Sequence, residues 1–114
     1  MTERGDVLVA IRRVGFGGTT APERFVLVQD DVLATELATL VVIPLEAWST
    51  DDASDPLSIR VSRAEAGTRQ DQSARVSLVG ARRRDRFATL PVGRLASATL
   101  GAIDEALRVL LALP

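Results

Sequence analysis

The chain has 114 residues and a net charge of −1, with 46% hydrophobic and 25% charged residues, and we expect residues 1–114 to form one globular domain. It contains neither cysteine nor histidine, which excludes disulfides, thiolate metal sites and the commonest general base. No apolar run approaches the roughly 20 residues of a membrane span, and the N-terminal stretch has no signal-peptide pattern. We therefore expect a cytoplasmic protein that does not contact the membrane and uses neither a metal ion nor a cofactor.

The first predicted element is a strand over residues 6–13, in which Val7, Val9 and Ile11 alternate with their neighbours. It leads into a loop at residues 15–22 whose glycines lack the spacing of a dinucleotide-binding motif. This loop is interpreted either as a mobile hairpin connection or as a flap over a groove. Arg12 and Arg13 form a basic spot just before this loop, where guanidinium groups make contact with phosphate possible.

Two short apolar runs, at residues 25–28 and 40–45, are predicted to be the central strands of one sheet. Both are rich in β-branched residues and are bounded by polar ones, which is typical of strands buried on both faces. The segment between them, residues 32–39, contains good helix formers and is expected to form a single helical turn. A buried strand holds a side chain more rigidly than a loop does, so we expect any active site at the ends of these two strands.

Polar and half-buried segments follow the second central strand. Residues 49–56 form an acidic loop, and alternating apolar residues predict further strands at residues 57–61 and 74–78. Residues 64–72 are expected to form a turn or loop, and a short extended piece is expected near residue 91. Residues 80–86 are expected to form a basic turn, in which Arg82 and Arg83 make contact with phosphate possible.

The last predicted element is an amphipathic helix. Its apolar stripe consists of residues spaced by three or four: Leu100, Ile103, Leu107 and Leu110. Ser97 or Thr99 is the expected N-cap. Asp104 and Arg108 are spaced for an ion pair along the helix. About five strands closed by one terminal helix predict a mostly β fold with a small, strongly curved, barrel-like sheet.

Four short motifs, in this order and spacing, resemble the MazF/PemK–CcdB superfamily of toxins from bacterial type II toxin–antitoxin pairs. They are the opening RGDV at residues 4–7, RFVLVQDD at 24–31, VVIPL at 41–45, and GRL at 93–95 followed by IDEAL at 103–107. The resemblance implies an SH3-like barrel with a C-terminal helix, of the MazF/CcdB toxin type. It also implies a homodimer and a cognate antitoxin as partner.

The superfamily contains two functional branches, and the motifs of this chain resemble both. The MazF-like opening and ending imply a metal-independent, sequence-specific endoribonuclease that cleaves single-stranded mRNA. On this resemblance, the candidates for RNA contact are Arg12, Arg13, Thr19, Thr20, Arg82 and Arg83. The alternative is a CcdB-like toxin that poisons DNA gyrase by binding, because residues 25–32 and 42–45 also resemble that branch. The chain ends in LLALP, without the aromatic-Gly-apolar tail of CcdB. An inert relative that retains only antitoxin binding is a third possibility.

The MazF pattern has an arginine before the second strand and a Thr or Ser just after the third. Arg24 matches the arginine, although counting back from Asp30 and Asp31 places Glu23 there instead, and Glu46 occupies the Thr/Ser position. Cleavage of RNA without a metal ion requires a base for the 2′-hydroxyl, a cation at the phosphate and an acid for the leaving oxygen. Our hypothesis makes Glu46 the base and Arg24 the phosphate clamp. In the alternative, the two residues form a surface ion pair of little value and the nuclease chemistry is lost, so the sequence leaves open whether the protein is an enzyme.

Overall fold

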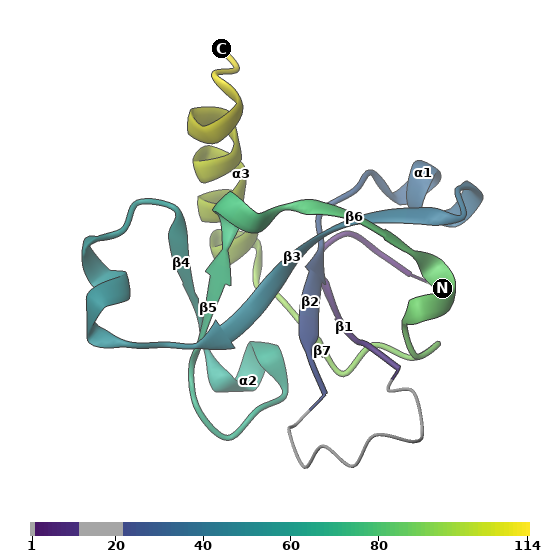
Figure 1. Ribbon diagram of the computed structural model, residues 1–114, viewed down its shortest axis with the longest axis horizontal. Helices are drawn as coiled ribbons and strands as arrows, with labels where there is room; N and C mark the ends of the chain where they lie inside the picture. Colours follow the sequence, from purple (N-terminus) through teal and green to yellow (C-terminus); the bar gives the residue numbers. More distant parts are fainter. Residues whose placement is uncertain (1, 12–21) are drawn as a thin grey trace.

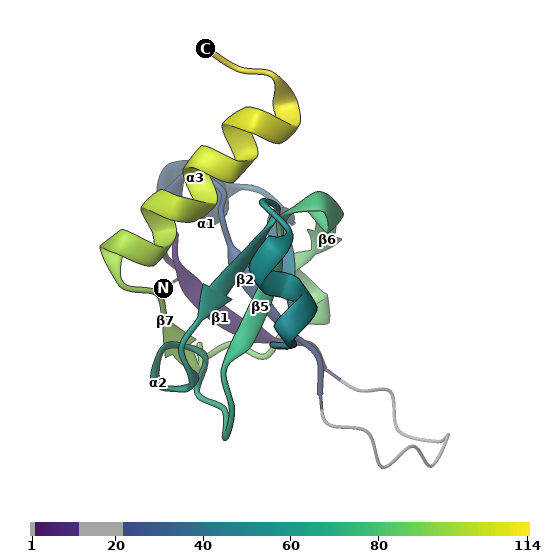
Figure 2. The same ribbon diagram turned by 90° about the vertical axis from the view of Figure 1, so that its left-hand side faces the viewer.

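The computed structural model describes residues 2–11 and 22–114, and it shows a curved sheet with one long helix across a face (Figures 1 and 2). The strands are β1 (Asp6–Val9), β2 (Arg24–Leu27), β3 (Thr39–Ala47), β4 (Ser58–Val61), β5 (Gln72–Arg75), β6 (Gly80–Arg83) and β7 (Gly93–Arg94). The helices are α1 (Asp31–Glu36), α2 (Arg63–Ala66) and α3 (Ser97–Leu111). The strand order is β4-β5-β3-β2-β1-β7, with β6 paired to β3 beside this path, and every pairing is antiparallel.

The centre of the sheet is β3, which is paired along both edges. One edge pairs with β2, in a register that sets Val26 opposite Ile43. The other edge pairs with β5 near its end and with β6 near its start, and a 3₁₀ turn (Val76–Leu78) separates these two partners. Both β5 and β6 run antiparallel to β3, so the chain continues along one edge of this long, curved strand, and the sheet forms a half-barrel (Figure 1).

Two hydrophobic clusters lie on opposite faces of β2 and β3. Val26 and Ile43 are fully buried on the face that α3 covers, and Ile103 of α3 packs into the same cluster. Leu27 and Val42 are buried on the other face, in a cluster closed by Phe87 and by Ala34 of α1. The prediction of central strands buried on both faces is therefore confirmed, as is the short helix between them.

The helix α3 confirms the predicted apolar stripe, but two of its local contacts differ from expectation. All four stripe residues pack on the core, while the N-cap is Ala96 rather than Ser97 or Thr99. The backbone N–H of Ala96 donates instead to Glu65 of α2, at 2.8 Å. The expected ion pair between Asp104 and Arg108 is wrong, because each finds a different partner. Asp104 binds Arg4 near the other end of the chain, and Arg108 binds Glu105 one turn back.

Three segments expected to be irregular form regular elements. The basic residues 80–83 form β6, whose strand state is fixed by pairing with β3 rather than by any apolar alternation. Residues 63–66 form α2, where Ser62 and Glu65 make a capping box and Gly67 ends the helix at a φ of +68°. The acidic residues Thr50–Ser54 form a 3₁₀ helix. The predicted fifth strand is shorter than expected and ends at Arg75.

Among residues 2–11 and 22–114, no helix is long and apolar enough to cross a membrane. The same residues contain no group of three or more His, Cys, Asp or Glu side chains placed to hold a metal ion.

Candidate functional site

An open groove of about 700 Å³ lies where β2 begins and β3 ends. One wall of the groove is the loop after α2. This loop begins at Gly67, the glycine that ends the helix. The groove is lined by Pro22, Glu23, Arg24, Leu45, Glu46, Ala47, Gly67, Thr68, Arg69, Gln70 and Gln72. Both residues proposed for catalysis, Arg24 and Glu46, are among them, so the sequence-based expectation of a site at the ends of the two central strands coincides with this groove.

Arg24 is the first residue of β2 and faces Leu45 across the β2–β3 pairing. Its Nη2 lies 3.5 Å from the carbonyl oxygen of Gly67, which directs the guanidinium toward the groove wall. Its Nε is buried and has no hydrogen-bond partner in the described part of the chain. Arg24 makes no ion pair with another described residue, so the N–H groups of its terminal nitrogens that do not face Gly67 are available to the oxygens of a bound anion.

Glu46 lies one residue further along β3, and its side chain is 56% exposed. Since neighbouring strand residues point to opposite faces, Glu46 leaves the sheet on the face opposite Leu45 and Arg24. Its Oε2 accepts a hydrogen bond from Nε of Arg75 at 2.8 Å. The alternative in which Arg24 and Glu46 form an ion pair with each other is therefore wrong: both line the groove, but Glu46 is held by Arg75.

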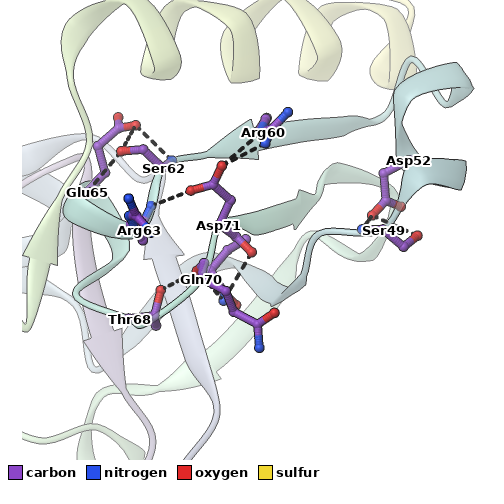
Figure 3. Close-up of polar contacts among 10 residues, drawn as sticks. Ser49, Asp52, Arg60, Ser62, Arg63, Glu65, Thr68, Gln70 and Asp71 are labelled. Carbon is purple, nitrogen blue, oxygen red and sulfur yellow. Dashed lines mark hydrogen bonds and ion pairs between the residues drawn. The ribbon is translucent and has the colours of Figure 1, made fainter.

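Arg75 is itself fixed by a second carboxylate. Asp52, whose side chain is 4% exposed, binds Nη1 of Arg75, and the same nitrogen lies 3.1 Å from the Ser58 hydroxyl. The backbone N–H of Ser49 donates to Asp52 at 2.8 Å (Figure 3), and this hydrogen bond lowers the pKa of the Asp52 carboxyl. Burial acts in the opposite direction, but the hydrogen bond from Ser49 and the interactions with Arg75 together outweigh it. Burial disfavours the charge of Arg75, but its hydrogen bonds to Glu46 and Asp52 prevail and raise its pKa. The Arg75 guanidinium is thus itself fixed by Asp52, and it holds the Glu46 carboxylate in place.

Two of the other candidate residues, Arg82 and Arg83, lie in the described part of the chain and do not line the groove. Arg82 of β6 lies over the ring of Phe25, with its Cζ 6.0 Å from the ring centre. It lines a smaller hollow of about 390 Å³ to which Glu23, Arg24 and Glu46 also contribute. Arg83 is exposed and pairs with Asp85 at 3.0 Å, outside both hollows. Four candidates lie outside the described residues: Arg12, Arg13, Thr19 and Thr20.

The sequence does not predict the groove wall at residues 67–70, which it indicates only as part of a turn or loop. The position of this wall depends on two glycines. A Cβ on Gly67 would lie 2.3 Å from the carbonyl oxygen of Val92, and one on Gly93 would lie 2.1 Å from that of Glu65. A local signal is nonetheless present, because Ser62, Glu65 and Gly67 carry the capping box and the left-handed end of a short helix.

Comparison with known proteins places the chain in a family. A family model described as "PemK-like, MazF-like toxin of type II toxin-antitoxin system" matches residues 3–111. The chain belongs to this PemK-like, MazF-like toxin family. It is thus a type II toxin by family, on the MazF side of the superfamily that its motifs resemble. No protein with curated functional information matches the chain.

Solved structures of MazF toxins share the fold. An endoribonuclease in complex with its cognate antitoxin from a mycobacterial species is 18% identical, with a TM-score of 0.76 over 100% of this chain and 98% of that one. The Mycobacterium tuberculosis toxin MazF-mt6 is 13% identical, with a TM-score of 0.75 over 96% and 98%. A MazE–MazF structure from Deinococcus radiodurans is 10% identical, with a TM-score of 0.75 over 99% and 98%. These similarities confirm the predicted fold, a mostly β half-barrel with a C-terminal helix of the MazF toxin type.

Proposed function

We propose that this toxin is a sequence-specific endoribonuclease that cleaves single-stranded mRNA without a metal ion. The observation that carries the proposal is the groove at the ends of the two central strands, which both Arg24 and Glu46 line. Because the strand register directs the two side chains to opposite faces of the sheet, the proposal requires the RNA to lie across the strand ends, between them. It is supported by membership of the PemK-like, MazF-like family and by the fold shared with an endoribonuclease from a mycobacterial species.

The chemistry assigned to the groove is an intramolecular displacement at phosphorus. The 2′-oxygen of one ribose attacks the adjacent phosphorus, and the bond from phosphorus to the 5′-oxygen of the next nucleotide breaks. Glu46 accepts the proton of the 2′-hydroxyl, and the N–H groups of Arg24 donate to the phosphate oxygens on which charge accumulates. The 5′-oxygen takes a proton from solvent, which gives a 2′,3′-cyclic phosphate and a 5′-hydroxyl.

The hydrogen bond from Arg75 gives Glu46 a fixed orientation for this role. Within the described part of the chain only one carboxylate oxygen is engaged, at 2.8 Å, so the other is able to accept the substrate proton. Glu46 stands where the MazF pattern has Thr or Ser, so the proposed division of labour departs from that pattern.

The proposal includes the partners expected of the family. A cognate antitoxin would bind and inhibit the toxin in the cytoplasm, as the mycobacterial endoribonuclease and the Deinococcus MazF were each solved with an antitoxin partner. The toxin would act as a homodimer. Sedimentation at micromolar concentration tests this part directly, and a monomer would contradict it.

The test of catalysis is cleavage of a mixed-sequence single-stranded RNA by the purified protein in EDTA. We expect discrete fragments with cyclic phosphate ends, and a loss of about 10²-fold or more in rate for both Arg24→Ala and Glu46→Gln. Arg108→Ala is the matched control, because Arg108 lies on α3, pairs only with Glu105 among the described residues and does not line the groove.

Intact RNA at high protein concentration would overturn the proposal, as would an Arg24→Ala variant that cleaves as fast as the parent. Growth arrest with intact RNA and trapped, cleaved DNA would point instead to the gyrase-directed alternative.

A further inference from the structure

A second hollow, of about 410 Å³, adjoins the groove on the far side of its wall. It is lined by Trp48, Arg60, Arg63, Arg69, Gln70 and Asp71. Arg69 and Gln70 line both the hollow and the groove, so the two form a continuous surface. Trp48 follows Glu46 by two residues, so the hollow begins just beyond the end of β3, the strand that carries the proposed catalytic carboxylate.

The side chains of the hollow are ordered around Asp71. Its Oδ2 accepts from both Nε and Nη2 of Arg60, at 3.0 and 2.8 Å, and its Oδ1 accepts from the backbone N–H of Arg63 at 3.0 Å (Figure 3). These contacts hold the Arg60 guanidinium over the indole of Trp48, with its Cζ 5.2 Å from the ring centre. The hollow therefore presents a planar cation that is backed by an aromatic ring and fixed by a carboxylate.

The charge of the hollow is not balanced by its own residues. Three arginines line it against one aspartate, and that aspartate is engaged by Arg60. Arg63 and Arg69 are exposed, and neither makes an ion pair with another described residue. In a chain with a net charge of −1, this local excess of two positive charges beside the groove favours an anionic ligand.

A flat stacking platform and two adjacent guanidinium groups together match the chemistry of a nucleotide. Bases of single-stranded RNA stack on aromatic rings and on arginine planes, and arginine binds phosphate through paired N–H groups. We propose that this hollow binds one nucleotide of the RNA strand next to the cleaved linkage, with its base on the Arg60–Trp48 pair and its phosphate between Arg63 and Arg69. The inference rests on the proposed ribonuclease function, and it assigns the strand a path from the groove across Arg69.

Trp48 allows a direct test, because it is the only tryptophan of the chain. A short single-stranded RNA with 2′-O-methyl groups at every position resists cleavage, so its binding can be followed by tryptophan fluorescence. We expect this RNA to change the fluorescence of the parent protein saturably. Arg63→Gln and Arg69→Gln should each weaken binding roughly tenfold and together reduce the slope of log affinity against log salt by about 0.7, the value for one lost phosphate of a single strand.

Arg63 does not line the groove, so Arg63→Gln should leave the cleavage chemistry intact on unmodified RNA, and KM should rise while kcat stays near the parental value. Arg108→Gln removes the same charge from the surface of α3 and should bind as the parent does. A circular dichroism melt of each variant verifies folding.

Three results separate the two proposals. If the parent cleaves RNA but Arg63→Gln and Arg69→Gln bind it as tightly as Arg108→Gln does, the nucleotide site is overturned and the ribonuclease proposal stands. If the parent neither binds nor cleaves RNA, both are overturned. A fluorescence change with polyglutamate but not with RNA would assign the hollow to an acidic protein partner, and it too would overturn the nucleotide site.

Discussion

Replacement of Gly67 by alanine tests whether the groove wall is held by a glycine-dependent contact. Gly67 has a φ of +68°, a left-handed conformation that costs a residue with a Cβ about 1–2 kcal/mol. The added Cβ would also lie 2.3 Å from the carbonyl oxygen of Val92, a backbone atom that moves only with its whole segment. The sum predicts a loss of at least about 2 kcal/mol in the free energy of unfolding.

Gly101→Ala is the matched control, because it makes the same chemical change in a different environment. Gly101 lies within α3, and a Cβ added there would meet no atom from another part of the described chain within 4 Å. Alanine exceeds glycine in helix propensity by about 0.8–1.0 kcal/mol, so this variant should be more stable than the parent by up to that amount. The two substitutions should therefore shift stability in opposite directions.

Urea unfolding followed by circular dichroism measures both changes. Gly67→Ala should also slow RNA cleavage, because the Gly67 carbonyl that contacts Arg24 moves with the wall, whereas Gly101→Ala should not. If Gly67→Ala unfolds at the same urea concentration as the parent, the close approach to Val92 does not constrain the wall and the reasoning fails.

Three further predictions concern the core, a shared cap and the response to acid. Ile103→Ala should cost about 2–5 kcal/mol in urea unfolding because this side chain is fully buried, whereas Val109→Ala, at a position 71% exposed on the same helix, should change stability by less than about 0.5 kcal/mol. Glu65→Ala removes the acceptor for the backbone N–H groups of Ser62 and Ala96 and should lower stability by about 1–2 kcal/mol, with Glu36→Ala on α1 as an unaffected control. The pKa values of Asp52 and Asp71 lie below their ordinary 3.8, so the folded state binds protons less readily than the unfolded state and stability should fall as the pH drops below about 4. Thermal melts from about pH 7 to about pH 2.5 should show this fall, and Asp52→Asn should flatten it; a parental melting temperature that stays constant over that range would contradict the assignment.

The sequence revealed those parts of the fold whose signal is local. Residues 25–28 and 40–45 are apolar at successive positions because both faces of β2 and β3 are buried, and the stripe of α3 repeats at helical spacing because one face covers the sheet. By contrast, β6 is rich in arginine and exposed, so nothing in its own residues distinguishes it from a turn. Its strand conformation comes from pairing with the start of β3, which lies much earlier in the chain.

The candidate site was predictable to a similar degree. Strand order and the family motifs indicated Arg24 and Glu46, because both sit at strand ends that pair directly. The partner of Glu46 was not predictable, because Arg75 reaches Glu46 diagonally from the neighbouring strand β5. Arg75 is in turn held by Asp52, which lies in a 3₁₀ helix at residues that were expected to form a loop. The hollow beside Trp48 likewise combines residues from separate segments: the end of β3, β4, α2 and the loop before β5. Only strand pairing in the folded sheet brings these segments together.

The contact between the two ends of the chain has a consequence for synthesis. Val7 and Ile103 share one buried cluster, β1 pairs with β7 along its outer edge, and Arg4 binds Asp104. A polypeptide that stops before residue 93 lacks both α3 and β7, so it leaves the apolar face of its sheet uncovered and one edge of β1 open. Such a fragment exposes the surface that would otherwise be buried against Ile103, and we expect it to be degraded readily by proteases.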